Sequence, residues 1–218
     1  MIRPFGPNEA LFLVEAAQWT VLLSLVAFVG GGLLGAVVAL ARVSPNRAVR
    51  WVAAGWIEVV QGTPVLILLF LTFYGLPLLG TRLPPLVAAG IGLTIYASAF
   101  LGDIWRGCIQ AVPAGQWEGA SALALSRWQR MRRVVLPQAV RLAVPPTVGF
   151  SVQVVKNTSV ASIIGFVELA RAGVLMNNVT FQPFRVFLTV AALYFVLCWP
   201  LSLASRRLER RLRVGPRG

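Results

Sequence analysis

The fold is decided by residues 115–141, which read GQWEGASALALSRWQRMRRVVLPQAVR and lie between long apolar segments. Within its first half, residues 117–125 are almost all small side chains around one glutamate, Glu118, and two leucines. The tetrapeptide that starts at Ser126 and ends at Gln129 then has the pattern of a capping box, which predicts the start of a new helix. Pro137 is expected to stop that helix, because proline lacks the backbone amide that a helix interior needs. The stretch therefore predicts two short helices that meet at an elbow and that arginines hold at a membrane surface.

The composition is that of an integral membrane protein. Hydrophobic residues make up 57% of the 218 residues and charged residues only 12%, whereas a soluble domain usually has about 25% charged residues. The net charge of +13 does not indicate nucleic-acid binding, because the arginines lie between apolar segments and at the C-terminus, where they orient a membrane protein. The two cysteines, Cys108 and Cys198, have no motif spacing and are expected to be packing residues. We expect a single membrane domain over residues 1–218.

Five apolar segments are long enough to cross a hydrocarbon core of about 30 Å as helices. Their approximate bounds are 19–41, 63–79, 86–105, 144–167 and 186–205. Dense arginine clusters follow the first segment, occupy the central stretch and form the C-terminal tail, which includes Arg213 and Arg217. An N-terminus outside the cell membrane and a C-terminus inside place all these clusters on the inner side, so the charge asymmetry decides the topology. The expected fold class is an all-α membrane protein with five transmembrane helices.

Several local patterns add detail to this outline. Gly62-Thr63-Pro64 is expected to bend the chain before the second span, after a half-apolar helix that contains Glu58. Pro145-Pro146 suits an entry turn to the fourth span, and the polar segment 168–185 is expected to lie outside the membrane.

Two residue pairs predict helix contacts. Gly31 and Gly35 form a GxxxG pair, which favours a close approach of two membrane helices. Asp103 and Arg106 are three residues apart on one helical face, and a salt bridge between them is the simplest interpretation.

Lys156 is the single lysine of the chain and lies in the middle of the fourth apolar segment. An ammonium group at the centre of a membrane helix costs about 3 kcal/mol on insertion scales, so it is rarely present without a role. Polar neighbours would let it bind a carboxylate in a water-filled cavity; they are Gln153, Asn157, Thr158 and Ser159. In the alternative, Lys156 extends to the membrane surface or fixes the bundle through an ion pair with Asp103, Glu58 or Glu168.

The sequence holds no catalytic constellation. It contains no histidine, which excludes histidine-based metal sites, proton shuttles and Ser-His or Cys-His catalysis. The GxxxxGK[ST], HExxH and GxSxG patterns are also missing. Any use of ATP is therefore expected to belong to another chain.

The central stretch resembles the cytoplasmic signature loop of ABC importer permeases, which reads E-A-A, three residues, G, nine residues, I-x-L-P. Glu118, Gly119 and Ala120 stand at its first three positions, and Ala124 falls on its glycine. Val134-Val135-Leu136-Pro137 then falls on I-x-L-P. Gly119 and Ala124 depart from the pattern but keep these positions small, with a stiffer bend expected between the helices.

Further matches, in order over about residues 20–206, resemble the polar amino-acid permeases of the His/Glu/Gln/Arg/opine type. They include Glu58-Val-Val-Gln61-Gly-Thr-Pro, Asp103-Ile-Trp-Arg-Gly and Lys156-Asn-Thr-Ser. The family usually has arginine at position 61 and aspartate at position 157. The neutral Asn157 is expected to weaken any preference for arginine or lysine as the solute.

The resemblance implies a type I ABC importer permease in the bacterial inner membrane, with a periplasmic N-terminus and a cytoplasmic C-terminus. Two permease chains, identical or paired with a sister, would line one pathway. A dimer of ATP-binding subunits would use ATP and Mg, and a periplasmic binding protein would deliver an amino acid. This chain itself would bind no cofactor and no metal.

The resemblance also implies roles for particular residues. Segment 113–141 would be the cytoplasmic coupling loop, and its contacts with the ATPase would come from Glu118, Gly119, Ala120, Leu123, Ala124 and Pro137. The substrate cavity would be lined by Gln153, Lys156, Asn157, Thr158 and Ser159. Structural or gating roles would fall to Glu58, Thr63, Pro64, Asp103 and Arg106.

Other functions stay open from the sequence. The chain would then be a permease for another small solute, such as a betaine, a sulfonate or an opine, or a non-transporting membrane scaffold for an ATPase. An elbow that binds only lipid is a further alternative, and an intramembrane enzyme is disfavoured because the catalytic sets are missing.

Overall fold

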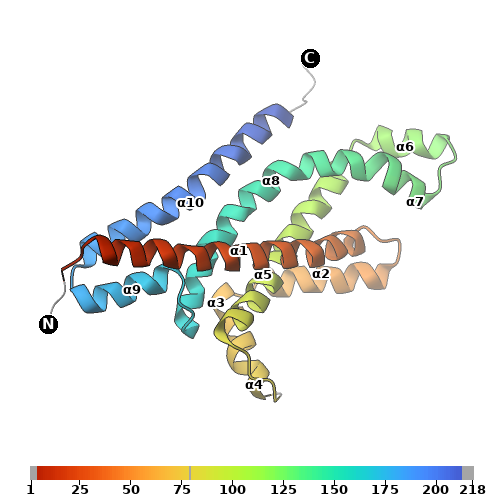
Figure 1. The fold of residues 1–218 in the computed structure, drawn as a ribbon. Coiled ribbons are helices and arrows are strands. Elements are labelled where there is room, and N and C mark those ends of the chain that lie inside the picture. The colour runs from red at the N-terminus through yellow and green to blue at the C-terminus, as the bar shows by residue number, and fades with distance from the viewer. Residues whose placement is uncertain (1–3, 79, 213–218) are drawn as a thin grey trace.

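The computed structural model describes residues 4–78 and 80–212, and the regular structure of these residues is entirely helical (Figure 1). The α-helices are α1 (Pro7–Arg42), α2 (Arg47–Gln61), α3 (Val65–Phe70), α4 (Leu76–Leu78), α5 (Pro85–Gln110), α6 (Ala114–Ala122), α7 (Arg127–Arg130), α8 (Leu136–Asn157), α9 (Leu169–Thr180) and α10 (Pro183–Leu212). Two π-helical turns, Leu71–Gly75 and Met131–Val135, and a 3₁₀ stretch, Thr158–Ile164, join some of them. Position 79, where the second span was expected to end, and the tail residues Arg213 and Arg217 lie outside the described residues.

Three helices, α1, α5 and α10, are each long and apolar enough to cross a membrane. Two bent pairs raise the number to as many as five: α2 with Val65–Leu78, bent by 101°, and Arg127–Ile164 with α9, bent by 50°. The expectation of an all-α membrane protein is therefore confirmed, with three to five candidate spans among the described residues.

The most extensive helix pair of the bundle is α1 with α5. A Cβ atom added at Gly31 would collide with the Cβ atom of Ala97, and one added at Gly35 would lie 3.1 Å from the Gly102 nitrogen and from the Ser98 carbonyl oxygen. Only glycine lets the two backbones approach so closely, which confirms the contact expected from the GxxxG pair.

The bend expected at Gly62-Thr63-Pro64 is confirmed, because α2 ends there and α3 begins at a steep angle to it. The Thr63 hydroxyl donates to the Val59 carbonyl at 2.7 Å and so closes the last turn of α2. Pro64 has no amide with which to continue the helix.

The expectations for the later prolines are wrong. Pro137 does not stop a helix: the helical stretch Arg127–Ile164 runs through the π-helical turn Met131–Val135, and Pro137 lies in the first turn of α8. The π turn changes the hydrogen-bond register just before the missing amide, so the chain stays helical. Pro145-Pro146 lies inside α8 rather than at its entry. The neighbouring helix α10 contacts α8 at these prolines, because the Ser205 hydroxyl donates to the Pro145 carbonyl at 2.9 Å.

The polar segment 168–185 forms α9 and the start of α10, and α9 packs against α1 and α10. Glu168 is fully buried, with 0% of its surface exposed. Its carboxylate caps α9 by accepting from the amides of Ala170 at 3.0 Å and Arg171 at 2.9 Å. The hydroxyls of Thr20 and Tyr194 also donate to it, at 3.3 and 2.7 Å. Glu168 therefore joins α1, α9 and α10.

Candidate functional site

The elbow between α6 and α7 lies at the same end of the molecule as the α1–α2 turn, opposite the N-terminus (Figure 1). Helix α6 ends in a Schellman motif, in which the Leu125 amide donates to the Ala120 carbonyl at 3.2 Å and the Ala124 amide to the Ser121 carbonyl at 2.9 Å. Ala124 adopts a left-handed conformation, with a φ of 53°. The permease pattern has glycine at this position. Glycine adopts the left-handed conformation without steric cost, which explains that preference.

The second helix of the elbow begins as expected. The Gln129 amide donates to the Ser126 hydroxyl at 3.3 Å, and the Ser126 amide donates to the Gln129 side chain at 2.9 Å, which confirms the capping box. The Arg127 guanidinium donates to the Val43 carbonyl, 3.2 Å away at the end of α1, and Arg130 donates to the Ser121 hydroxyl. These bonds hold the elbow in one shape and attach it to α1.

The inner face of the elbow packs on the end of α5. The buried residues of this cluster are Ile109, Val112, Met131, Val135 and Ala139, and the half-buried Trp117 packs against them. Ala120 is only 4% exposed. It therefore belongs to the inner face of α6 and does not share a surface with its neighbours Glu118 and Gly119, which are exposed.

The outer face of the elbow contains exposed apolar side chains. Leu123 is 76% exposed and Trp128 is 67% exposed, while Ala124 and Pro137 are also exposed. A Cβ atom at Gly119 would meet nothing within 4 Å, so packing within this chain does not require glycine there. Trp128 lies at helical spacing from Met131 and Val135, but only the latter two are buried. Trp128 is therefore an addition to the predicted outer surface.

The polar residues around Lys156 do not all face one space. Gln153 and Lys156 are exposed, whereas Asn157 and Ser159 are half-buried. Thr158 is fully buried, and its hydroxyl donates to the Val155 carbonyl at 2.8 Å. The accessible polar surface therefore consists of Gln153 and Lys156, with partial contributions from Asn157 and Ser159.

Lys156 forms no ion pair among the described residues. Asp103 pairs instead with Arg106, whose Nη2 and Nε atoms lie 2.8 and 2.9 Å from the same carboxylate oxygen, which confirms the predicted i,i+3 salt bridge. Glu168 is occupied by its four donors, and Glu58 is exposed on α2. Lys156 therefore does not pair with Asp103, Glu58 or Glu168, and this alternative from the sequence is wrong.

Aromatic rings lie beside this polar surface. Tyr96 and Phe100 of α5 and Phe150 of α8 stack with ring centroids 4.6 to 6.0 Å apart. The Tyr96 hydroxyl faces the Asn157 side chain. Sequence reasoning missed this group, although the four-residue spacing of Tyr96 and Phe100 on one apolar helix was a signal for it.

Three comparisons with known proteins agree with one another. The model of the family described as "Binding-protein-dependent transport system inner membrane component" matches residues 31–214. A probable glutamine ABC transporter permease of Bacillus subtilis (strain 168), GlnM, is 34% identical over 193 residues, which cover 88% of this chain and 89% of that protein. The L-cystine transport system permease TcyB of the same strain is 34% identical over 196 residues, covering 89% and 83%. The crystal structure of an amino acid ABC transporter with histidines contains a chain that superposes with a TM-score of 0.86 at 33% identity, covering 92% of this chain and 94% of that one.

Membership of such a family has direct consequences. The inner-membrane component of an ABC transporter is a multi-pass, non-catalytic subunit, so ATP hydrolysis belongs to a partner ATPase. A binding-protein-dependent system also includes a solute-binding protein, and its membrane component typically needs no cofactor. The chain belongs to the family of inner-membrane components of binding-protein-dependent transport systems, in which it is a permease subunit.

Proposed function

We propose that this chain is one of two permease subunits, identical or paired with a sister, of an importer that moves a polar amino acid across the inner membrane. The observation that carries the proposal is the exposed Lys156 ammonium, which lacks a carboxylate partner among the described residues. Every amino acid has a carboxylate, and Gln153 and Asn157 add hydrogen-bond donors beside the ammonium. The relatives whose names specify glutamine and L-cystine support an amino acid over a betaine or a sulfonate.

In the proposed topology the single domain 1–218 has the type I fold and crosses the membrane five times. Each bent pair contains one proposed span, and the five spans keep the bounds 19–41, 63–79, 86–105, 144–167 and 186–205. The elbow and the α1–α2 turn, both rich in arginine, lie in the cytoplasm, and the N-terminus lies in the periplasm. Glu58, Thr63 and Pro64 at the 101° bend, and the Asp103–Arg106 pair, would keep the helices around the pathway in place.

Segment 113–141 is the proposed coupling loop. The exposed residues Glu118, Gly119, Leu123 and Ala124 would enter a groove of the ATPase dimer, which binds ATP and Mg, while Pro137 would border this contact. Buried Ala120 would keep α6 seated on its own chain. A periplasmic binding protein would deliver the solute to the opposite side.

A continuous helical stretch supports coupling between the two proposed sites. Residues 127–157 are helical from the elbow to Lys156 and Asn157, a length of about 45 Å at 1.5 Å per residue. Closure of the ATPase dimer would displace α6, and the bonds of Arg127 and Arg130 would transmit this displacement to α1 and to the start of this stretch. The cavity at Lys156 would then alternate between outward and inward access.

The experiment that tests this function uses two pairs of variants in the transporter reconstituted with its ATPase and binding protein. Leu123→Asp should prevent co-purification of the ATPase, because an exposed leucine that is buried in a partner contributes about 2 kcal/mol; Leu123→Met, which conserves volume, should not. Lys156→Met should abolish solute-stimulated ATP hydrolysis and uptake while the complex stays assembled, and Lys156→Arg should retain part of both.

The outcomes separate the competing functions. A Leu123→Asp complex that assembles and hydrolyses ATP like the wild type would contradict the coupling surface. Unchanged uptake in Lys156→Met would remove Lys156 from the solute site, and hydrolysis that no solute stimulates would favour a scaffold over a transporter. Arginine or lysine as the best-transported amino acid would contradict the preference expected from Asn157.

A further inference from the structure

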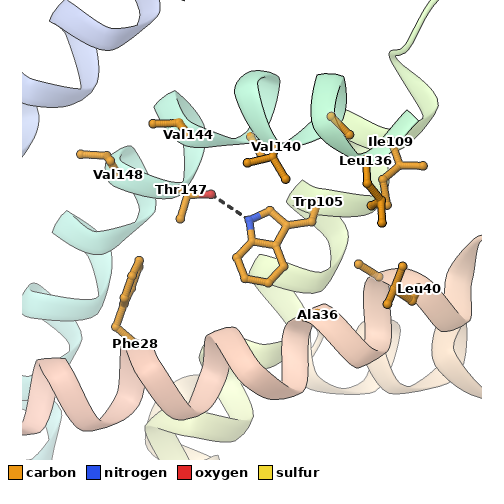
Figure 2. A pocket seen from close by; sticks show the side chains of 13 residues that line it. Phe28, Ala36, Leu40, Trp105, Ile109, Leu136, Val140, Val144, Thr147 and Val148 are labelled. Atoms are coloured by element: carbon orange, nitrogen blue, oxygen red, sulfur yellow. Dashed lines mark hydrogen bonds between the residues drawn. The ribbon is translucent and has the colours of Figure 1, made fainter. Parts of the chain in front are cut away.

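An open apolar cavity lies between α1 and α8, with α5 behind it, and it is separate from the polar residues around Lys156 (Figure 2). Its volume is about 480 Å³, and its walls include Ala36 and Leu40 of α1, Trp105 of α5, and Val140 and Val144 of α8. At Phe28 and Val148 it continues into a second apolar cavity of about 470 Å³ between α1, α8 and α10. Each volume lies in the range of about 300–1,000 Å³ that is usual for ligand pockets.

The hydroxyl groups that line these cavities already form hydrogen bonds within the chain. Thr147 accepts from the Trp105 indole nitrogen at 2.8 Å, as Figure 2 shows. Ser24 donates to the Thr20 carbonyl and Ser151 to the Val148 carbonyl, both at 2.7 Å. The rest of the lining is apolar, so the cavities favour an apolar occupant over a polar solute.

The cavities also face away from the proposed solute pathway. Ser151 lines the second cavity, and at 3.6 residues per turn Gln153 and Lys156 point about 160° and 140° away from it around α8. A partner permease that shares the polar pathway would therefore approach the opposite face of α8. The cavity face would then be open to the surrounding membrane.

The arginine-rich end of the molecule lies next to the first cavity along both α1 and α8. Helix α1 ends at Arg42, two residues beyond the cavity residue Leu40, and four arginines lie in segment 127–133, just before the cavity residue Leu136. Arg42 and Arg127 donate to the backbone carbonyls of Arg50 and Val43, which are neutral acceptors. None of these arginines has an ion-pair partner among the described residues, and the Nε atom of Arg42 is buried without a hydrogen-bond partner. This end of the molecule therefore has an excess of positive charge, with Glu118 as the carboxylate of the elbow.

We propose that the first cavity holds an acyl chain of an anionic phospholipid, with the phosphate bound by the arginines of the α1 end and of the elbow. The distance from Phe28 to Leu40 along α1 is about 18 Å, close to the depth of about 15 Å of one leaflet in a 30 Å core. Basic pockets between membrane helices on the cytoplasmic side are known to bind acidic headgroups. The proposal needs the membrane location of the chain but does not depend on the solute.

The test uses Trp105 as a probe, because it lines the cavity. The purified transporter with its partner subunits is placed in nanodiscs that contain brominated acyl chains on either phosphatidylglycerol or phosphatidylcholine. The Trp105 signal is the difference in emission between the wild type and Trp105→Phe. Brominated phosphatidylglycerol should quench this signal at a lower mole fraction than brominated phosphatidylcholine does. Ala36→Phe, which fills the cavity, should remove the quenching, whereas Val37→Phe on the neighbouring face, 65% exposed, should not.

The headgroup contact is tested by Arg127→Gln combined with Arg133→Gln. The preference for phosphatidylglycerol should fall roughly fivefold for each arginine removed. The matched control is Arg171→Gln with Arg185→Gln, at the other end of the chain, which should leave the preference unchanged. Retention of phosphatidylglycerol in native mass spectrometry, compared between the wild type and the two double variants, gives the same test without a change at Trp105.

Three results would overturn the proposal. Trp105 that neither lipid quenches would mean that protein, such as a second permease, covers the cavity. Equal quenching by both lipids would mean an apolar contact without an anionic site. An equal loss of preference in both double variants would mean that net charge, rather than these arginines, attracts the lipid.

Discussion

Replacing Ala124 by glycine should stabilise the elbow, although it removes atoms from the protein. Ala124 has a φ of 53° at the end of α6, where a Cβ atom costs about 1–2 kcal/mol. Glycine removes this strain. It also lowers the free energy of unfolding by about 0.5–1 kcal/mol, because the unfolded chain has more conformational freedom with glycine than with alanine. At the midpoints of these two ranges, the expected net gain is about 0.75 kcal/mol in the local stability of the elbow.

Hydrogen exchange of the complete transporter measures this gain, because the amides concerned have defined partners. The Leu125 amide donates to the Ala120 carbonyl at 3.2 Å and the Leu123 amide to the Gly119 carbonyl at 3.1 Å. In the Ala124→Gly variant both amides should exchange roughly two- to fivefold more slowly, once the intrinsic rates of the new sequence are taken into account.

Ala122→Gly is the matched control, because it removes the same atoms two residues away at a helical position of α6. Glycine in a helix costs up to about 1 kcal/mol relative to alanine, so exchange in this variant should be faster than in the wild type. If Ala124→Gly also speeds exchange, or leaves it unchanged, the left-handed strain at Ala124 is not a determinant of elbow stability.

Two further changes probe the bundle through the thermal unfolding of the purified transporter. Gly31→Ala places a Cβ atom against Ala97 and should destabilise the α1–α5 pair by about 1–3 kcal/mol. Gly55→Ala, where nothing lies within 4 Å, should not lower the melting temperature, and equal losses in the two variants would contradict the packing argument. Tyr194→Phe removes the hydroxyl that donates to Glu168 at 2.7 Å and should cost about 1–3 kcal/mol. An unchanged melting curve would show that this bond does not contribute to stability.

The features that the sequence predicted well depend on residues close together in the chain. The capping box of Ser126, the salt bridge of Asp103 with Arg106 and the bend at Thr63-Pro64 each involve residues at most three positions apart. The GxxxG contact is the exception, because it joins α1 to α5. It was predictable because small residues have one main use in membrane helices, which is a close approach of two backbones.

The features that the sequence did not predict depend on distant partners or on changes of register. Burial of Glu168 requires the Thr20 hydroxyl, 148 residues away, and the Tyr194 hydroxyl, which no local pattern indicates. An ion pair of Lys156 with a carboxylate was one of the alternatives from the sequence. Whether it forms depends on which carboxylates already bind other groups, and the sequence does not show this. The error at Pro137 came from a rule for regular α-helices, and the π-helical turn before it is not regular.

If a helix ended at Pro137, the elbow would be a surface element separate from the fourth span. The structure instead connects the elbow to Lys156 through residues 127–157, which are helical throughout. This stretch lacks two ladder hydrogen bonds at Pro145-Pro146, so bending is easiest there. The Ser205 hydroxyl of α10 donates to the Pro145 carbonyl at the same point. In the proposed coupling, a displacement that enters at the elbow would therefore reach α10 at Pro145 before it reaches the exposed ammonium, and α10 would have to follow any bend that moves Lys156.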